Sequence, residues 1–426
     1  MTSNQTAIVI GGGVIGCTTA YYLSKQGWQV RVVEARRVGR GASHGNCGYI
    51  CPSHVLPLTS SDALWSTMKK MFSKDSAIYI KPRWDPSLWW WLIRFAMRCR
   101  HSAMMEAARA RHTLLQSAMT LYREMLAEEH LDVEWEDRGL LLVWNSPHEF
   151  ETYQKAADFT RNEFGIGPNR VEGSQLTAIE PALRSGLAGG WHWLTDAHLR
   201  PDRLMTALRE LLERRGVEIQ EGVQVNDFEV TAGRAAAIET SSGRMAAELF
   251  VVAAGAESPA FARRLGCRLP IQPGKGYSIT MPRPQGAPTT PLIFEEYHVA
   301  VTPWPSGMRI GSTMEFAGYD RTINRRRIDL FKRAAAEYLV GQGSPPADPN
   351  SNSAPAVEEW YGWRPMTYDD VPIIGRAPRA ENVVVAAGHG MIGVASGSAS
   401  GKLAAELATG SQPHIDPAPY SLRRFG

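Results

Sequence analysis

The sequence predicts an α/β fold in which a Rossmann-like parallel sheet alternates along the chain with a second part built on an antiparallel sheet. Three observations indicate this arrangement. The chain opens with a strand, a glycine-rich turn and a helix. Short segments of alternating polarity occupy residues 276–313. A buried strand and a helix of small residues follow at residues 382–407, so the Rossmann-like pattern returns near the C-terminus.

The first of these segments carries the clearest motif. Residues 6–16 read T-A-I-V-I-G-G-G-V-I-G, which predicts a buried strand, a Gly-x-Gly-x-x-Gly turn and the start of a helix. Gly11 permits a tight turn, Gly13 lets the backbone approach a diphosphate, and Gly16 allows close helix packing. The helix N-terminus presents N–H groups and a partial positive charge to phosphates. The segment is therefore typical of dinucleotide binding.

A second strand is predicted at residues 29–33 and ends in Glu34, about 20 residues beyond the glycine turn. A carboxylate at this position accepts hydrogen bonds from an adenosine ribose and repels the 2′-phosphate of NADP. The motif therefore favours a dinucleotide with free ribose hydroxyls.

Between the two ends, the periodicity predicts helices at residues 86–98, 104–129 and 201–216. In the first, Asp85 is an N-cap and Pro86 suits the first turn. This helix is rich in tryptophan and is followed by arginines. Two interpretations stay open: a core helix beneath residues 104–129, or an interfacial helix lying on an anionic membrane surface. Residues 51–84 and 341–356 are expected to be loops.

Composition limits the remaining function classes. The chain has 426 residues, 44% of them hydrophobic, and a net charge of +3, which does not indicate nucleic-acid binding. Its five cysteines are scattered without a Cys-x-x-Cys pair, so no metal site is predicted; pairing of Cys47 with Cys51 stays open. The first strand begins almost at once without a secretory leader, and we expect a cytoplasmic protein.

Several further motifs occur in a characteristic order. They are G-A-S-H-G-N-C-G at residues 41–48, V-A-A-G-A at 252–256, Y-H-V-A-V-T at 297–302, R-I-G at 309–311, G-W-R-P-M-T at 362–367 with Asp370, P-I-I-G at 372–375 and G-H-G at 388–390. With the N-terminal turn and Glu34, the chain resembles the FAD-dependent oxidoreductases of the D-amino acid oxidase superfamily. The closest likeness is to bacterial D-amino acid dehydrogenases.

The resemblance implies a Rossmann-like FAD-binding domain interleaved with an α+β substrate domain whose antiparallel sheet covers the flavin. The FAD-binding domain is expected at residues 1–50, 150–275 and 356–426, and the substrate domain at 51–149 and 276–355. The cofactor is expected to be non-covalent FAD.

The resemblance also implies site residues. Arg364, in the Gly-x-Arg-Pro motif, is expected to hold the substrate carboxylate, because a guanidinium fork matches a carboxylate; a structural salt bridge is the alternative. Tyr277 and Tyr297 are candidate hydroxyl donors to the same carboxylate, or packing residues. His389 is expected to order flavin contacts or to line the substrate pocket.

Cofactor contacts are expected from the glycine turn, the second strand end, the loop at residues 41–48 and the C-terminal turn. His44 is interpreted as a neighbour of the flavin. The full expected set is Gly11, Gly13, Val14, Ile15, Gly16, Glu34, Ala35, Ser43, His44, Asn46, Gly48, Val225, Ala254, Gly255, Gly388, Gly390, Met391 and Ile392.

The function implied by the resemblance is oxidative deamination of D-amino acids, with electrons passed to a quinone or another membrane acceptor. An oxidase or dehydrogenase of the glycine, sarcosine or D-hydroxyproline type is the first alternative. A flavoprotein subunit without catalytic activity is the second. If the acceptor is in the membrane, we also expect this protein to contact the inner face of the membrane peripherally.

Overall fold

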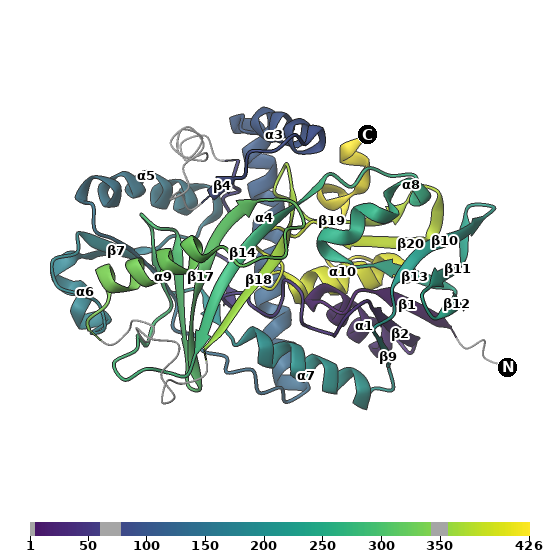
Figure 1. Ribbon diagram of the computed structural model, residues 1–426, viewed down its shortest axis with the longest axis horizontal. Helices are drawn as coiled ribbons and strands as arrows, with labels where there is room; N and C mark the ends of the chain where they lie inside the picture. The colour runs from purple at the N-terminus through teal and green to yellow at the C-terminus, as the bar shows by residue number, and fades with distance from the viewer. Residues whose placement is uncertain (1–4, 60–77, 342–356) are drawn as a thin grey trace.

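The computed structural model describes residues 5–59, 78–341 and 357–426. Two sheets lie on either side of helix α4 (His101–Glu128), which runs between them in Figure 1. The antiparallel sheet occupies the left of that view and the mainly parallel sheet the right. The first described strand and the C-terminus lie on the side of the parallel sheet.

The mainly parallel sheet has the strand order β19-β20-β13-β1-β2-β9. Its strands are β1 (Thr6–Ile10), β2 (Gln29–Glu34), β9 (Glu218–Glu221), β13 (Leu249–Val252), β19 (Ile373–Ala377) and β20 (Ala380–Ala387). Strands β20, β13, β1, β2 and β9 are parallel, and β19 is antiparallel to β20. The strand expected at the N-terminus therefore lies at the centre of this sheet, as the buried sequence of β1 indicates.

Three helices pack their apolar residues against one face of this sheet. They are α1 (Val14–Lys25), α7 (Pro201–Arg214) and α10 (Gly397–Thr409). A Cβ added at Gly401 of α10 would lie 2.3 Å from the hydroxyl of Thr18 in α1, so the two helices pack too closely for a side chain there. Helix α4 packs against α10, and its buried face joins the same core.

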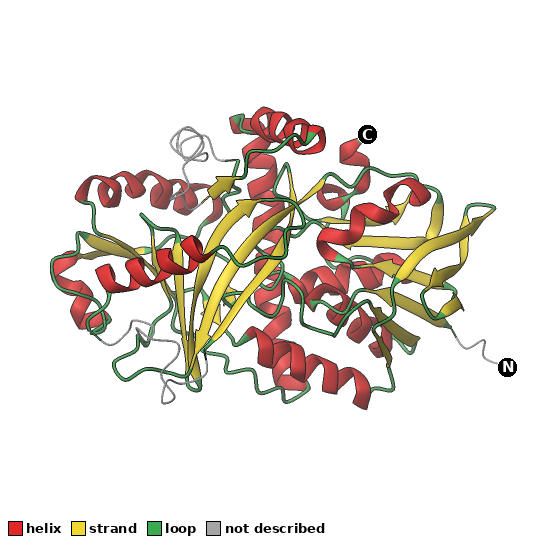
Figure 2. Cartoon of the chain, viewed as in Figure 1, coloured by secondary structure: helices red, strands yellow, loops and turns green. Residues whose placement is uncertain are grey.

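The second sheet forms the left half of the molecule in Figure 2. Its main path is β18-β14-β17-β16-β15-β5-β7-β6, and β4 pairs with β17. The strands are β4 (Ile78–Ile80), β5 (Leu140–Trp144), β6 (Asn169–Glu172), β7 (Gly189–Trp193), β14 (Ile271–Met281), β15 (Leu292–Phe294), β16 (Val299–Trp304), β17 (Gly307–Phe316) and β18 (Glu358–Thr367). The predicted antiparallel character of residues 276–313 is confirmed by the pairing of β14, β16 and β17.

The membership of this sheet differs from the boundaries expected in the sequence. Strands β6, β7 and β18 belong to it, although residues 150–275 and 356–426 were assigned to the FAD-binding domain. Helix α4, assigned to the substrate domain, packs on α10 instead. These partners are distant in sequence, and local periodicity does not specify which sheet a strand joins.

The remaining described elements surround these two layers. They are β3 (Tyr49–Ile50) with β8 (Ala197–His198), the antiparallel β10 (Val225–Thr231), β11 (Arg234–Thr240) and β12 (Gly243–Ala246), the helices α3 (Pro86–Arg98), α5 (Pro147–Phe164), α6 (Gly173–Ile179), α8 (Ala262–Leu265) and α9 (Arg325–Tyr338), and the 3-10 turns η1 (Gly255–Phe261), η2 (Ala418–Tyr420) and η3 (Leu422–Phe425).

Local sequence signals account well for several of these elements. Asp85 caps α3 by accepting a hydrogen bond from the N–H of Leu88, and Pro86 occupies the first turn. All five cysteines are free thiols, so Cys47 and Cys51 are not paired. Residues 342–356 of one predicted loop and residues 60–77 of the other lie outside the described residues, and the described remainder of the second loop includes β4.

Candidate active site

A cavity of about 1000 Å³ lies between the two sheets. It is lined by the carboxyl ends of the parallel strands, the loop at residues 36–46, η1, strand β18 and the turn at residues 389–394. Ligands of open parallel sheets bind at the carboxyl ends of the strands, and the volume suits a large cofactor together with a small substrate.

The glycine turn at the end of β1 forms one wall of the cavity. Gly11 has a φ of +108°, and a Cβ built there would lie 2.4 Å from the carbonyl oxygen of Ala253. A Cβ at Gly16 would lie 1.9 Å from the carbonyl oxygen of Gly11. Side chains at either position would push the turn away from its neighbours, so both glycines are required by close backbone packing.

Polar contacts hold this wall in place. The Glu34 carboxylate accepts hydrogen bonds from the N–H groups of Gly12 and Arg36, both at 2.8 Å. Ser43 accepts a hydrogen bond of 3.0 Å from the N–H of Val14, the first residue of α1. The loop at residues 41–48 is thereby attached to the helix N-terminus that was predicted to face phosphates.

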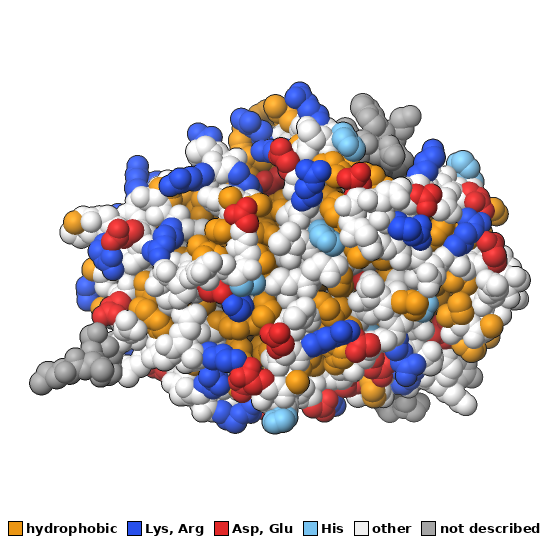
Figure 3. All heavy atoms as spheres, turned by 180° about the vertical axis from the view of Figure 1, so that it is seen from behind, with side chains coloured by type: hydrophobic (Ala, Val, Ile, Leu, Met, Phe, Trp, Pro, Cys, Tyr) orange, Lys and Arg blue, Asp and Glu red, His pale blue; other side chains and the backbone are white. Residues whose placement is uncertain are grey.

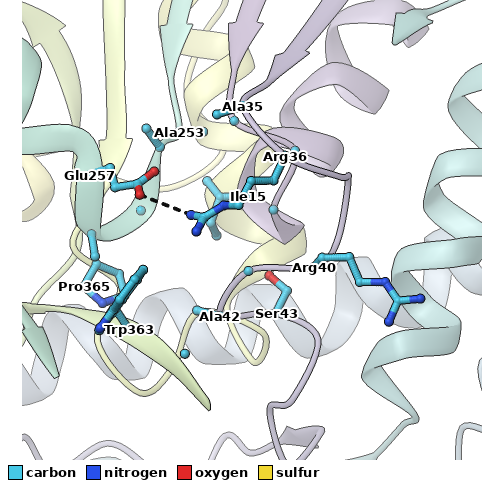
Figure 4. Close-up of a pocket in the computed structure, with 18 of the residues that line it drawn as sticks. Ile15, Ala35, Arg36, Arg40, Ala42, Ser43, Ala253, Glu257, Trp363 and Pro365 are labelled. Atoms are coloured by element: carbon cyan, nitrogen blue, oxygen red, sulfur yellow. Dashed lines mark hydrogen bonds and ion pairs between the residues drawn. The ribbon is translucent and has the colours of Figure 1, made fainter. Parts of the chain in front are cut away.

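An ion pair joins the loop after β2 to η1 at the edge of the cavity. Arg36 lies 3.2 Å from Glu257, and Figure 4 shows the two side chains meeting. The Arg36 guanidinium also lies 5.9 Å from the ring centroid of Trp363 on β18. Arg40 points away from this group in the same view. The edge of the cavity is therefore formed by both halves of the molecule.

Arg364 lies on the opposite wall, on strand β18. Its Nη1 donates to the carbonyl of Thr313 at 2.7 Å and its Nη2 to that of Ser312 at 3.4 Å. Ser312 and Thr313 have φ values of +98° and +45°, a strained conformation for residues with side chains. A Cβ at Gly276 would lie 2.3 Å from Nη1, so that glycine makes room for the guanidinium. Irregular backbone in β17 thus orients Arg364.

The charge of Arg364 is not balanced by a neighbouring acid. No carboxylate of the described residues forms an ion pair or a hydrogen bond with it; its described hydrogen bonds go to the two carbonyls. Burial lowers the pKa of the Arg364 guanidinium below its ordinary value. The salt-bridge alternative considered for Arg364 therefore has no partner in the described chain.

The cavity brings together most of the residues expected to contact the cofactor or substrate. Its lining includes Gly11, Gly13, Val14, Ile15, Glu34, Ala35, Ser43, Asn46, Val225, Ala254, Gly255, Arg364, His389 and Gly390. The lining does not include Gly16, His44, Gly48, Gly388, Met391, Ile392, Tyr277 or Tyr297. The glycines in this second set have packing roles, as the close approach of Gly16 to Gly11 illustrates.

Both candidate tyrosines lie away from Arg364. The Tyr277 hydroxyl is buried and donates to Glu315 at 2.9 Å. Tyr277 and Gly276 are consecutive on β14, so their side-chain positions face opposite sides of the sheet, and Gly276 faces Arg364. Tyr297 donates to Glu337 at 2.5 Å. The structure therefore places neither hydroxyl beside the guanidinium.

His389 lies in the cavity wall and is almost fully buried. Its Nε2 has no hydrogen-bond partner among the described residues. Burial lowers its pKa to about 3, so the imidazole is neutral at physiological pH. A buried nitrogen without a partner, on a residue that lines a cavity, is a candidate contact for a bound ligand.

His44 is not among the residues that line the main cavity, although Ser43 and Gly45 on either side of it are. Its Nε2 lies 2.7 Å from Glu358 at the start of β18, and it lines an adjoining hollow of about 620 Å³. The pair links the loop at residues 41–48 to the substrate-side sheet. His44 is therefore placed as an anchor of that loop.

Several cavity residues carry no sequence motif that could have revealed them. Trp360 and Tyr361 come from β18, Tyr319 from the loop after β17 and Glu257 from η1. One signal was present: Gly45 and Gly362 are both glycines because the Trp360 ring lies over them. A lone sequence does not show this, because the three residues meet only through folding.

The comparisons with known proteins agree with this architecture. Residues 6–407 match a family model described as FAD dependent oxidoreductase. The chain is 34% identical over 427 residues to a D-amino acid dehydrogenase of Paramagnetospirillum magneticum, covering 98% of each chain. It is 32% identical over 433 residues to a D-amino acid dehydrogenase of Chromohalobacter salexigens, covering 98% of this chain and 99% of the other.

Solved structures show the same fold at low sequence identity. Glycine oxidase from Geobacillus kaustophilus superposes with a TM-score of 0.76 at 22% identity and covers 98% of both chains. L-proline dehydrogenase from P. horikoshii has a TM-score of 0.74 at 20% identity and covers 100% of this chain and 98% of its own.

The residues present fit FAD. The glycine turn leaves a cradle that side chains would fill, Glu34 lines the cavity at the end of β2, where this type of fold carries an acid for the ribose, and the cavity has room for a dinucleotide. The orphaned Nε2 of His389 offers one further polar contact. The chain belongs to the FAD-dependent oxidoreductase family, and FAD is its cofactor.

Proposed function

We propose that this enzyme oxidises D-amino acids to imino acids, which hydrolyse in solution to 2-oxo acids and ammonia. The observation that carries the proposal is Arg364, a cation without a carboxylate partner in the described chain, at the wall of the cofactor cavity. A substrate carboxylate would supply the missing anion. The names of the relatives that match over nearly the whole chain support the D-amino acid assignment.

The chain's own residues bind and orient the substrate in this proposal. Arg364 holds the carboxylate by two parallel hydrogen bonds and so limits the directions in which the α-hydrogen can point. Bound FAD supplies the acceptor for that hydride. The substrate amine must be neutral, and His389 stays uncharged beside it because burial lowers its pKa to about 3. No protein base is required when the amine loses its proton on binding.

Anaerobic mixing with a panel of amines tests the proposal. The purified protein should be yellow, and its visible flavin absorption should be lost with D-amino acids but not with their L-enantiomers. Faster loss with glycine, sarcosine or D-hydroxyproline would favour the first alternative. A flavin that stays oxidised with every amine would favour a subunit without catalytic activity.

We further propose that electrons pass to a quinone-type acceptor at a membrane surface, and helix α3 supports this. Leu88 and Trp91 are buried, and the Trp91 indole donates to the carbonyl of Met366, two residues from Arg364. The opposite face exposes Trp89, Trp90, Ile93 and Met97. At the top of the rear view in Figure 3, where α3 lies, apolar surface adjoins cationic side chains. One face of α3 therefore packs against the protein, in a different cluster from α4, and the other face is free for the membrane contact proposed here.

This composition suits an interfacial helix, with tryptophans at headgroup level and arginines near anionic lipid. Among the described residues, no helix combines the length and apolar character needed to cross a bilayer. Sedimentation with anionic liposomes should recover more wild-type protein than Trp89→Ser/Trp90→Ser, with equal dye-coupled activity. Equal sedimentation would contradict the membrane contact, and rapid stoichiometric peroxide formation would contradict the quinone acceptor.

A further inference from the structure

We infer that the indole of Trp360 is the wall against which the substrate's side chain packs, and that it selects amino acids with large apolar, above all aromatic, side chains. The inference rests on the proposed function, because Arg364 must hold the substrate carboxylate. It concerns a residue outside every motif in the chain. The argument depends on where β18 and β14 place two side chains.

Trp360, Gly362 and Arg364 alternate along β18, so their side-chain positions face the same side of the sheet. Gly362 pairs directly with Gly276 of β14. A Cβ on Gly276 would lie 2.3 Å from Nη1 of Arg364, and one on Gly362 would lie 2.2 Å from Cζ2 of Trp360. Opposed Cβ positions are roughly 5 Å apart. The guanidinium and the indole therefore stand side by side above one pair of glycines.

The indole is also fixed from the other side. A Cβ on Gly45 would lie 2.0 Å from Cδ2 of Trp360, so the ring lies against the loop at residues 41–48 as well as against β18. The ion pair of His44 with Glu358, at 2.7 Å, attaches that loop to the same strand. Trp360 is half-buried and lines the cavity, so part of the ring is available to a ligand. The Trp360 indole is therefore held between two segments and forms an apolar wall of the cavity.

An amino acid held by its carboxylate on Arg364 has its α-carbon one bond from that carboxylate, and its side chain begins there. The neighbouring surface is then the flat indole, which gains from aromatic contact and from removing apolar area from water. A charged side chain would lose hydration against the same surface. Trp360 therefore favours D-phenylalanine over D-alanine, and both over D-aspartate.

The test compares wild type, Trp360→Ala and Trp360→Phe on D-phenylalanine and D-alanine with a dye acceptor. We expect Trp360→Ala to lower kcat/KM for D-phenylalanine about 10-fold, mainly through KM, and to change D-alanine less than about 3-fold. Trp360→Phe should keep most of the preference for D-phenylalanine over D-alanine. Trp84→Ala, at a side chain that is 91% exposed, is the matched control and should not alter the preference.

A binding measurement gives a second readout that does not depend on turnover. The dissociation constants of 3-phenylpropionate and propionate are obtained from the shift in visible flavin absorption, with FAD content and Tm recorded for each variant. Trp360→Ala should weaken 3-phenylpropionate about 10-fold and propionate little. Equal losses for both ligands and both substrates would overturn the inference while leaving the proposed function intact. Wild-type protein that oxidises no amino acid would instead refute the proposed function.

Discussion

The two walls of the cavity are built by different means. The nucleotide wall is mostly backbone: the glycine turn after β1, the N-terminus of α1 and two N–H groups held by Glu34. The substrate wall is mostly side chains, with Arg364 and Trp360 standing above paired glycines of β14 and β18. The first wall comes largely from one contiguous stretch, whereas the second is assembled from strands that are far apart in sequence.

Because the two walls are built from different segments, cofactor binding and substrate choice depend on separate parts of this molecule. The nucleotide wall carries an acid where a ribose is expected, and the substrate wall carries a cation without a carboxylate partner among the described residues. Substitutions on one wall should therefore change FAD affinity, and substitutions on the other should change amino acid turnover.

The largest expected effect is on the substrate wall. Arg364→Ala should lower kcat/KM for a D-amino acid about 30- to 1000-fold, because a charge-assisted pair in a dehydrated site contributes roughly 2–4 kcal/mol. Arg364→Lys should restore little of this activity, since an ammonium does not form the bidentate contact. Steady-state kinetics measure the loss. FAD content should match wild type, and unchanged kinetics would show that another group holds the carboxylate.

A smaller and complementary effect is expected on the nucleotide wall. Glu34→Ala removes the acceptor of the Gly12 and Arg36 N–H groups and of the ribose, and should weaken FAD binding about 10- to 100-fold. Fluorescence titration of apoprotein with FAD measures this. The KM for the amino acid at saturating FAD should stay within about 3-fold of wild type. If Glu34→Ala altered the KM for the amino acid as strongly as it altered FAD affinity, cofactor binding and substrate binding would not depend on separate walls.

The smallest effect concerns His389, where the walls meet. Burial lowers its pKa to about 3 from an ordinary 6.5, so the unfolded chain binds a proton that the folded chain does not between these values. Protonation of His389 in the unfolded chain therefore has little effect on the free energy of unfolding above pH 6.5, and it lowers that free energy as the pH falls from 6.5 towards 3. Between pH 6.5 and 5 this group should cost about 1–2 kcal/mol of unfolding free energy.

Urea unfolding at several pH values should show a shallower loss in His389→Asn than in wild type. Because the imidazole stays neutral, kcat/KM between pH 6 and 9 should keep the same profile in both proteins. His198, another buried histidine whose pKa is lowered to about 4, gives a control for stability outside the cavity. An inflection near pH 6.5 that disappears in His389→Asn would identify His389 as an acid–base group.

Local signals in the sequence predict the nucleotide wall and identify the family. The turn at Gly11–Gly16 and the acid at Glu34 are local signals, because a strand, a turn and a helix N-terminus that are adjacent in the chain are adjacent in space. The alternation of the two sheets was equally visible in the periodicity, and so was the capped start of α3.

On the substrate wall the sequence motif predicts Arg364, whereas the orientation and neighbours of its guanidinium follow from contacts that form only in the folded chain. Arg364 is oriented by a carbonyl 51 residues away, and His44 pairs with Glu358 across 314 residues. The face of β14 that carries Gly276 turns Tyr277 away from the cavity, which a single residue of register would have reversed. The same pairing brings Trp360 beside Arg364. Which residues meet above the paired glycines depends on strand register, and register is a property of the folded sheet, not of any local segment.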